Sequence, residues 1–188
     1  VGLGAYANSQ HLSNAERIPH LFLKTVCDMQ TDLLEKAQKA YNVPHAVTQY
    51  DALLADDEID AVIITTRDET HAALTMQALQ AGKHVYVEKP LAPTSEEIEQ
   101  VIAAQEGTGR YVTTGFNRRF APAYVKAKEI ILQHGGARNV YYRISDDYVR
   151  GWGKQLGYAP GIRVMHEVCH IFDILRWLAD SDVVSIYC

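Results

Sequence analysis

Short apolar runs alternate with longer amphipathic stretches along the first part of the chain. The apolar runs predict buried strands at 21–27, 60–65, 83–87 and 110–114, with a shorter extended segment at 45–47. The stretches between them have helical composition and are predicted to span 7–16, 31–41, 50–55, 70–81 and 94–106. Because strands alternate with helices, the pattern predicts a parallel, doubly wound α/β sheet over residues 1–115.

Two helix starts can be predicted from the residues that would cap them. Thr94 and Glu97 have the spacing of a capping box, in which side chains at a helix start bond the free backbone N–H groups. Thr70 is a candidate N-cap of the helix at 70–81. Gly82 is suited to end the same helix, because glycine adopts the left-handed conformation at little cost.

The pattern changes after residue 115. The predicted elements are, in order, a helix, an antiparallel strand, a glycine-rich loop, a helix and an apolar strand-like run: 121–134, 139–149, 151–161, 163–179 and 182–188. They predict a second domain, 116–188, that is α+β in class and incomplete.

Composition and charge exclude several classes of protein. The chain is 47% hydrophobic and 22% charged, which is ordinary for a soluble globular protein. Its net charge of −5 argues against a nucleic-acid or anionic-membrane surface, and no apolar run approaches the roughly 18 residues of a membrane span. The three cysteines, Cys27, Cys169 and Cys188, have no metal-type spacing, which favours reduced thiols and a cytoplasmic protein.

A glycine turn opens the chain. Gly2, Gly4 and Ala7 match G-x-G-x-x-A, a turn that lets a pyrophosphate approach backbone N–H groups at a helix start. Asp28 ends the next strand, where a carboxylate accepts hydrogen bonds from both ribose hydroxyls of an adenosine and repels a 2′-phosphate. The pattern therefore predicts a dinucleotide site that prefers NAD to NADP. Only Val1 precedes the turn, which normally follows a complete strand, so we expect this chain to be a fragment.

Glu88-Lys89-Pro90 follows the strand at 83–87 and supplies the best catalytic candidate. Lys89 closes a buried strand at the carboxyl end, where α/β sheets bind ligands. A lysine in such a cleft can donate a hydrogen bond to a reacting oxygen, while Pro90 restricts the turn. Together with the glycine turn, this lysine favours a nicotinamide oxidoreductase.

A polar loop, 65–71, follows the strand at 60–65, on the side of the sheet where the dinucleotide should lie. His71 is either a residue of this site or a surface residue in the first turn of the next helix.

The string His166-Glu167-Val-Cys-His170 matches H-E-x-x-H. Two histidines one helical turn apart can bind zinc, with the glutamate as general base, but a third protein ligand is also needed and no glutamate occurs after Glu167. The same spacing fits a helix that turns His166, His170 and Asp173 toward a substrate, with a histidine taking the hydroxyl proton. A histidine satisfied within the core is the third alternative.

With these motifs in view, the chain resembles the Gfo/Idh/MocA family of oxidoreductases, which includes glucose–fructose oxidoreductase and inositol dehydrogenase. The resemblance covers nearly the whole chain and is most specific at Glu88-Lys89-Pro90. The matching segments are the glycine turn, 26–28, 60–66, His71, 81–91, 115–120 and 167–173.

The resemblance implies an N-terminal NAD-binding Rossmann domain, 1–115, and a C-terminal domain, 116–188, that binds substrate and commonly forms the oligomer interface through its sheet. It implies that Lys89 and His170 polarise the substrate and transfer the proton, while Asp173 binds substrate. Substrates of such enzymes are sugars, sugar derivatives, nucleotide sugars or cyclitols, and a homo-oligomer is expected.

The candidate residues fall into three groups, and no metal ligand is predicted. Those for the cofactor are Gly2, Gly4, Ala5, Tyr6, Asp28, Thr65, Thr66, His71, Glu88, Lys89 and Asn117. Those for the substrate are Arg119, His166 and Asp173, and the catalytic pair is Lys89 and His170.

One departure from the family pattern keeps other functions open. Many members carry an aspartate where this chain has His166, so the catalytic carboxylate is absent or is replaced by Glu167 or Asp173. The alternatives are a non-catalytic dinucleotide-binding protein of the same fold and the zinc hydrolase.

Overall fold

The computed structural model describes residues 1–136, 139–145 and 164–187. The chain divides into two compact units, Val1–Gly115 and Phe116–Cys188. Each unit is described by itself below.

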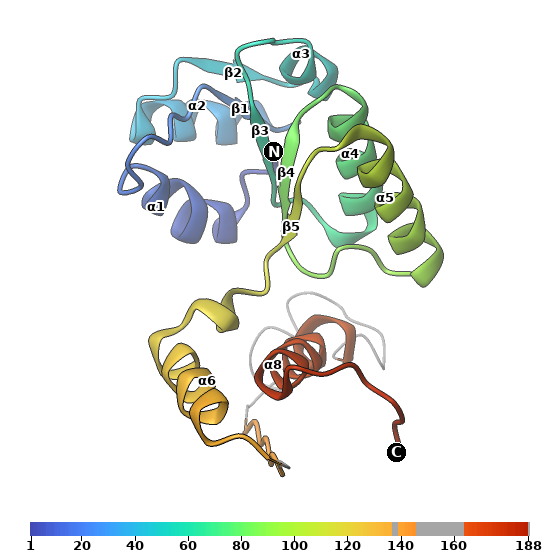
Figure 1. Cartoon of the computed structure of the whole chain (residues 1–188). Helices are drawn as coiled ribbons and strands as arrows, with labels where there is room; N and C mark the ends of the chain where they lie inside the picture. The colour runs from blue at the N-terminus through green and yellow to red at the C-terminus, as the bar shows by residue number, and fades with distance from the viewer. Residues whose placement is uncertain (137–138, 146–163, 188) are drawn as a thin grey trace. The chain divides into compact units, whose positions relative to one another are not determined.

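Five short parallel strands form the centre of the first unit (Figure 1). β1 (Thr25–Cys27) pairs with β2 (His45–Val47), while β3 (Ala61–Ile64), β4 (His84–Val87) and β5 (Val112–Thr114) form a second sheet in that order. Every pairing is parallel, so the prediction of a parallel α/β sheet is confirmed for this unit.

The backbone at Val1 and Gly2 joins the two sheets. The Gly2 amide donates to the Cys27 carbonyl at 2.9 Å, and the Thr65 amide donates to the Val1 carbonyl at 2.9 Å. These two residues therefore lie between the end of β1 and the end of β3. A groove of about 520 Å³ continues along the facing edges of the same two strands.

The helices of this unit lie on both sides of the strands (Figure 1). A π-helical turn η1 (Ala7–Leu12) and α1 (Ser13–Ala15) follow the glycine turn. The remaining helices are α2 (Thr31–Tyr41), α3 (Tyr50–Leu54), α4 (Asp68–Gln80) and α5 (Ser95–Thr108). Figure 1 shows α1 and α2 on one side of the strands and α4 and α5 on the other, which is the doubly wound arrangement.

Two helix starts test the predictions made from single residues. At α5 the Glu97 amide donates to Thr94 Oγ1 at 3.3 Å, and the Thr94 hydroxyl contacts the Glu97 carboxylate, so the predicted cap is confirmed. The prediction for Thr70 is wrong, because α4 begins two residues earlier, at Asp68. The Thr70 hydroxyl instead lies 2.8 Å from the Arg67 carbonyl, inside the first turn.

The strand predicted at 21–27 is shorter in the structure. Its first residues do not pair, and Leu21 and Phe22 are exposed. The reason is that β2 begins at His45, which is in register with Thr25. Lys24, just before β1, accepts a hydrogen bond from the His45 amide at 3.1 Å, and its ammonium forms ion pairs with Asp56 and Glu58.

Beside a small apolar cluster around Ala72, Ala92 and Val101, two larger apolar clusters form the core of the first unit. The larger one combines β3 and β4 with α3 and α4, and Ile64 and Val87 at the strand ends are fully buried. The smaller one packs the glycine turn and η1 against β1 and α2 through Leu3, Leu12 and Leu34. Because Ile64 and Val87 are fully buried, the ends of β3 and β4 are fixed positions on which loops can be held.

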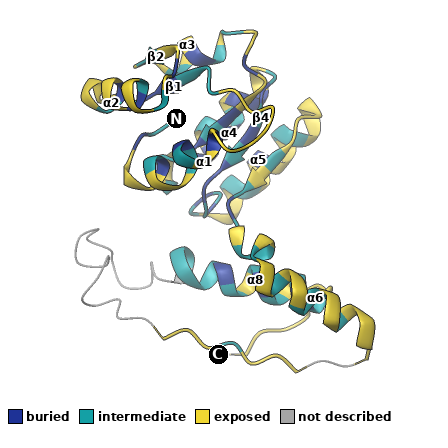
Figure 2. Ribbon diagram, turned by 90° about the vertical axis from the view of Figure 1, so that its left-hand side faces the viewer, coloured by how far each residue is buried: buried dark blue, intermediate teal, exposed yellow. Residues whose placement is uncertain are grey.

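The regular elements among the described residues of the second unit are all helical. A 3₁₀ turn η2 (Asn117–Phe120) precedes α6 (Pro122–His134), and a π-helical turn η3 (Val164–Val168) leads into α8 (Cys169–Ala179). Lys128 on α6 joins α6 to α8, because its ammonium donates to the Trp177 carbonyl at 2.5 Å and lies 5.5 Å from the centre of the Trp177 ring. Figure 2 shows α6 without buried residues, whereas α8 buries His170, Ile174 and Leu178.

Two strand-like segments predicted for the second unit are not strands where the structure describes them. Residues 139–145 and 182–187 are irregular, and Val184 is 99% exposed. A strand needs the backbone of a neighbour for its hydrogen bonds, and the described residues of this unit supply none. The rest of the segment at 139–149 and the predicted loop at 151–161 lie outside the described residues.

Candidate functional site

The carboxyl ends of the parallel strands bring the predicted cofactor residues of the first unit to one edge. Thr65 follows β3, Glu88 follows β4, and Gly115 follows β5. Gly2 lies beside β1 and β3 through the two backbone hydrogen bonds described above. Ligands of open α/β sheets bind at this edge.

The glycine turn has the shape that a pyrophosphate requires. Gly2 has φ +83°, and a Cβ there would lie 2.9 Å from the Thr66 amide nitrogen, so only glycine fits. A Cβ at Gly4 would meet nothing within 4 Å, and Gly4, Ala5 and Tyr6 are exposed. The turn therefore presents an open backbone surface at the start of η1.

Asp28 is fixed beside this turn. The Leu3 amide donates to Asp28 Oδ2 at 2.7 Å, and the Gln30 amide donates to Oδ1 at 2.9 Å. Each oxygen keeps a further lone pair, so the carboxylate can still accept ribose hydroxyls. These residues fit an NAD molecule, with the turn holding the pyrophosphate and Asp28 the adenosine ribose.

Thr65 and Thr66 act on the turn itself. The Thr65 hydroxyl lies 2.6 Å from the Gly2 carbonyl and 2.9 Å from the Val1 carbonyl. Its side chain is therefore committed to the backbone of the glycine turn. Thr66 packs against Gly2, as described above. The loop after β3 therefore supports the glycine turn.

His71 is buried, with 2% of its surface exposed, so the alternative of a surface first-turn residue is wrong. Its Nδ1 lies 2.7 Å from the Pro90 carbonyl oxygen and its Nε2 lies 3.1 Å from the Thr66 carbonyl oxygen. The ring therefore connects the loop after β3 to the turn that carries Lys89.

Glu88 is the centre of a buried network. Its Oε1 lies 2.9 Å from His11 Nε2 and accepts from the Tyr86 hydroxyl at 3.2 Å, while its Oε2 accepts from the Lys89 amide at 3.2 Å. Burial raises the pKa of the Glu88 carboxyl, but the hydrogen bonds from His11 and the Lys89 amide outweigh it and leave this pKa below its usual value. The carboxylate is therefore held ionised at the end of β4.

His11 is a functional candidate that the sequence analysis missed. It lies one helical turn after Ala7, which is buried against the strands, and this spacing places it on the same inward face. Its ring packs edge-on against Tyr6 and Tyr86, with ring centres 5.7 and 5.3 Å away. The i, i+4 spacing from Ala7 is the signal that could have found it.

The second unit holds the remaining predicted residues. His170 is buried on α8, with its ring edge-on to Phe116 at 5.9 Å between ring centres. Asp173 accepts both branches of the Arg119 guanidinium, Nε donating at 2.8 Å to Oδ2 and Nη2 contacting Oδ1. Both were predicted to bind substrate, and the structure pairs them with each other.

The H-E-x-x-H string spans two helical elements. His166 lies in η3 and His170 in α8, so one regular α-helical face does not carry both. Glu167 lies 3.9 Å from the Arg118 guanidinium, whose Nη1 also donates to the Tyr142 hydroxyl at 3.3 Å. Over the described ranges, no three histidine, cysteine, aspartate or glutamate side chains gather as metal ligands would.

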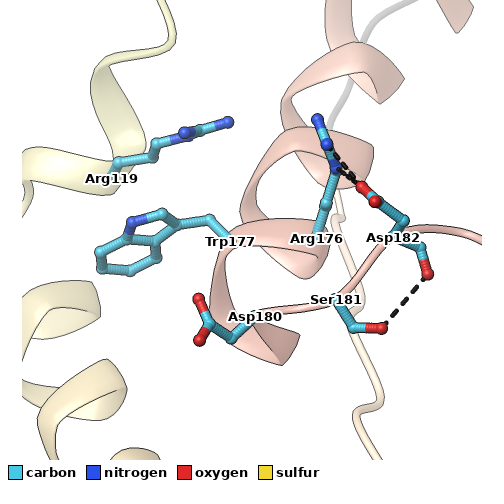
Figure 3. A pocket seen from close by; sticks show the side chains of 6 residues that line it. All are labelled: Arg119, Arg176, Trp177, Asp180, Ser181 and Asp182. Carbon is cyan, nitrogen blue, oxygen red and sulfur yellow. Dashed lines mark hydrogen bonds and ion pairs between the residues drawn. The ribbon is translucent and has the colours of Figure 1, made fainter.

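A polar pocket of about 350 Å³ lies at the carboxyl-terminal end of α8 (Figure 3). It is lined by Arg119, Arg176, Trp177, Asp180, Ser181 and Asp182. Figure 3 shows Arg176 paired with Asp182, and Arg176 Nε donates to Asp182 Oδ1 at 3.0 Å. His170 does not line it, so this pocket is separate from the predicted proton-transfer residue.

Residues 1–116 match the model of the family GFO_IDH_MocA, described as an oxidoreductase family with an NAD-binding Rossmann fold. The chain belongs to the Gfo/Idh/MocA family. The match covers the glycine turn, Asp28 and Glu88-Lys89-Pro90, so the first unit is the NAD-binding Rossmann domain of this family. No helix in the described part of this family member is long and apolar enough to cross a membrane.

Individual relatives agree with this assignment. An inositol 2-dehydrogenase of Paracoccus denitrificans is 31% identical over 154 residues, covering 78% of this chain and 41% of that protein. The crystal structure of a myo-inositol 2-dehydrogenase from Lactobacillus plantarum matches with a TM-score of 0.81 and 26% identity, over 94% of this chain and 54% of that one.

A scyllo-inositol dehydrogenase from Lactobacillus casei, solved with bound NAD(H) and scyllo-inositol, matches with a TM-score of 0.78 and 25% identity. The match covers 94% of this chain and 54% of that one. This chain thus spans about half the length of the relatives it matches.

We predict that the chain binds NADH more tightly than NADPH and that Asp28→Asn reverses the order. The amide keeps an oxygen acceptor for the Leu3 amide but loses the charge that strengthens ribose binding and repels a 2′-phosphate. The dissociation constant for NADH should rise about tenfold, or about 1.4 kcal/mol. Nicotinamide fluorescence measures both titrations.

The matched control is Asp32→Asn, four residues further along on α2, where the carboxylate is exposed and pairs with Lys36 at 3.1 Å. It should change neither dissociation constant. A preference of the unmodified chain for NADPH would contradict the role given to Asp28.

We further predict that Gly115→Ala destabilises the first unit by about 1–3 kcal/mol, the usual cost of forcing extra volume into a packed site. A Cβ there would lie 2.8 Å from Glu88 Oε2 and 2.9 Å from the Tyr86 hydroxyl oxygen, so the Glu88 network must move. Urea denaturation measures the free energy of unfolding.

Gly107→Ala in α5 is the control, because a Cβ there meets nothing within 4 Å. It should leave stability unchanged or raise it by about 0.5–1 kcal/mol, since alanine favours helix. Equal stability of the two alanine variants would show that Glu88 does not require the space at Gly115.

Proposed function

We propose that the whole protein is an NAD-dependent oxidoreductase that moves a hydride between nicotinamide and a secondary hydroxyl or keto group of a sugar, sugar derivative or cyclitol. The observation that carries this proposal is the position of Lys89. It closes β4 at the same edge of the sheet as the glycine turn and Asp28. The inositol dehydrogenases among the relatives support a polyhydroxylated substrate.

In this proposal, NAD held by the glycine turn and Asp28 would supply the hydride chemistry, and side chains of this protein act on the substrate oxygen. Lys89 donates a hydrogen bond to that oxygen and stabilises the negative charge that develops on it. His170 takes the hydroxyl proton as the carbonyl forms and returns it in the reverse reaction. The buried position of His170 and its packing against Phe116 limit its ring to few orientations.

Arg119 and Asp173 support His170 in this scheme. The two carboxylate oxygens of Asp173 face two nitrogens of Arg119, which fixes the carboxylate three residues after His170 on α8. The pairing raises the pKa of the Arg119 guanidinium. The ion pair therefore orders the helix face that carries the proposed base.

A second candidate function is cofactor binding without turnover. It is favoured by His166, which stands where many family members carry an aspartate. The two carboxylates near His170 that are candidates to replace that aspartate already have partners, Asp173 with Arg119 and Glu167 with Arg118. This candidate predicts NADH binding without oxidation of any sugar or cyclitol.

We predict that Lys89→Ala and His170→Ala each lower kcat by about 10²–10⁴-fold, the usual contribution of a positioned proton donor or acceptor. The dissociation constant for NADH should change little, because the glycine turn and Asp28 are expected to supply most of the contacts that hold the dinucleotide. The measurement is NADH formation by the whole protein over a panel of inositols and aldoses.

Lys36→Ala and His134→Ala serve as controls, because both side chains lie on exposed helix surfaces. They should leave kcat unchanged. Full turnover in the Lys89→Ala, His170→Ala double variant would sink the proposed mechanism. Tight NADH binding without turnover in the unmodified protein would establish the second candidate instead.

A further inference from the structure

His71 bridges the two loops on which the proposed chemistry depends. It lies in the first turn of α4 and is almost completely buried. Its two ring nitrogens face two carbonyl oxygens that lie 24 positions apart in the sequence, those of Thr66 and Pro90. The imidazole is therefore a rigid spacer between the loop after β3 and the turn after β4.

The Thr66 end of this bridge is itself fixed. Thr66 packs against Gly2, where a Cβ would come within 2.9 Å of its amide nitrogen and of its Cγ2. The neighbouring Thr65 hydroxyl contacts the Gly2 carbonyl at 2.6 Å. The Thr66 carbonyl is thus part of the platform that supports the glycine turn.

The Pro90 end holds the turn that carries Lys89. Proline has no N–H, so its carbonyl oxygen is the one backbone polar group through which Pro90 can be held. Pro90 is buried, and a buried carbonyl needs a donor. On the other side of Lys89, its own amide donates to Glu88 Oε2. The lysine backbone is therefore fixed from Glu88 before it and from His71 after it.

The two contacts of the His71 ring differ in strength. Carbonyl oxygens only accept, so each contact needs an N–H on the ring. A neutral imidazole supplies one N–H and a protonated imidazole supplies two. The Nδ1 contact to Pro90, at 2.7 Å, is shorter than the Nε2 contact to Thr66, at 3.1 Å. We therefore take the bond to Pro90 as the one that matters most.

We propose that His71 is a positioning residue, which holds the Lys89 turn in register with the glycine turn by donating from Nδ1 to the Pro90 carbonyl. This inference rests on the proposed function, in which Lys89 touches the substrate. It replaces the direct cofactor contact that the sequence predicts for His71 by an indirect role. The buried ring reaches the reaction through the Lys89 turn that it holds.

Three substitutions separate the Nδ1 contact from the Nε2 contact and from simple filling of the core. The amide nitrogen of an asparagine side chain can take the place of Nδ1, and that of a glutamine side chain can take the place of Nε2. His71→Asn thus keeps a donor for Pro90, and His71→Gln keeps a donor for Thr66. His71→Phe keeps a ring of similar size and has no donor.

In the whole protein, we expect His71→Phe and His71→Gln to lower kcat by about 10–100-fold, because a displacement near 1 Å at a catalytic group costs up to about 10²-fold. His71→Asn should recover most of this loss. The dissociation constant for NADH should stay within about threefold in all three variants, because the substitutions move a catalytic group and leave the contacts that bind the cofactor in place. A merely structural role would instead lower kcat in proportion to the folded fraction, with no rescue by asparagine.

Amide hydrogen exchange over residues 84–92 gives a readout that does not depend on turnover. We expect exchange in this segment to rise about tenfold in His71→Phe and His71→Gln and to stay near the unmodified value in His71→Asn, because only asparagine holds Pro90. Equal exchange in all four proteins would overturn the inference. Equal kcat in all four active proteins would overturn it as well.

The two readouts also separate this inference from the proposed function. If the unmodified protein oxidises no substrate of the panel, the proposed function fails and the exchange pattern alone decides the inference. Protection that is lost with phenylalanine and glutamine but kept with asparagine supports it. If the unmodified protein is active, His71→Asn must resemble it in both kcat and amide exchange, while His71→Phe and His71→Gln differ from it in both.

Discussion

The buried carboxylate of Glu88 is the interaction on which the candidate site depends. An ionised carboxylate removed from water is costly unless hydrogen bonds replace its hydration. Here the partners come from two segments: His11 after the glycine turn, and the segment of Glu88 itself, through the Tyr86 hydroxyl and the Lys89 amide. Gly115, after β5, leaves the space that the carboxylate fills. If one partner moves, the charge loses its compensation, so the segments are held together by the cost of separating them.

The parallel sheet makes this network possible. Parallel strands carry their carboxyl ends to one edge, and β3, β4 and β5 are aligned so that Ile64, Val87 and Thr114 lie side by side. The loops that follow therefore start from fixed neighbouring points. The network around Glu88 and the bridge through His71 then set the distances between those loops, which strand pairing alone leaves open. Packing of the strands fixes the edge, and buried polar contacts fix the site.

The sequence was sufficient for the strands and helices of the first unit because each has a local signal. The apolar run before Glu88 and the Thr94 cap depend on residues within a few positions of each other, and both predictions are confirmed. The chain also belongs to the predicted family. What the sequence could not give were contacts between residues far apart. The spacing from Ala7 can place His11 on the inward face, but nothing local identifies Glu88, 77 positions away, as its partner.

Predictions failed where local signals competed with each other or lacked a partner. Thr70 has the chemistry of a cap, but Asp68 and Glu69 already suit the positive end of the helix, and α4 begins at Asp68. The run at 182–187 has strand composition but no neighbouring strand among the described residues. The formation of a homo-oligomer and the substrate-binding role of the second unit stay predictions.

Two carboxylates near His170, Asp173 and Glu167, differ in how free they are to take part in the proposed chemistry. Both oxygens of Asp173 already face N–H groups of Arg119, so the carboxylate has fewer lone pairs left to accept a further hydrogen bond. Glu167 is 43% exposed at its side chain and lies 3.9 Å from Arg118, a longer and weaker pairing. Of the two, Glu167 therefore has more of its hydrogen-bond acceptor capacity left. If a carboxylate assists His170 in place of the aspartate that many family members carry at position 166, Glu167 is the better candidate, while Asp173 serves to order the helix.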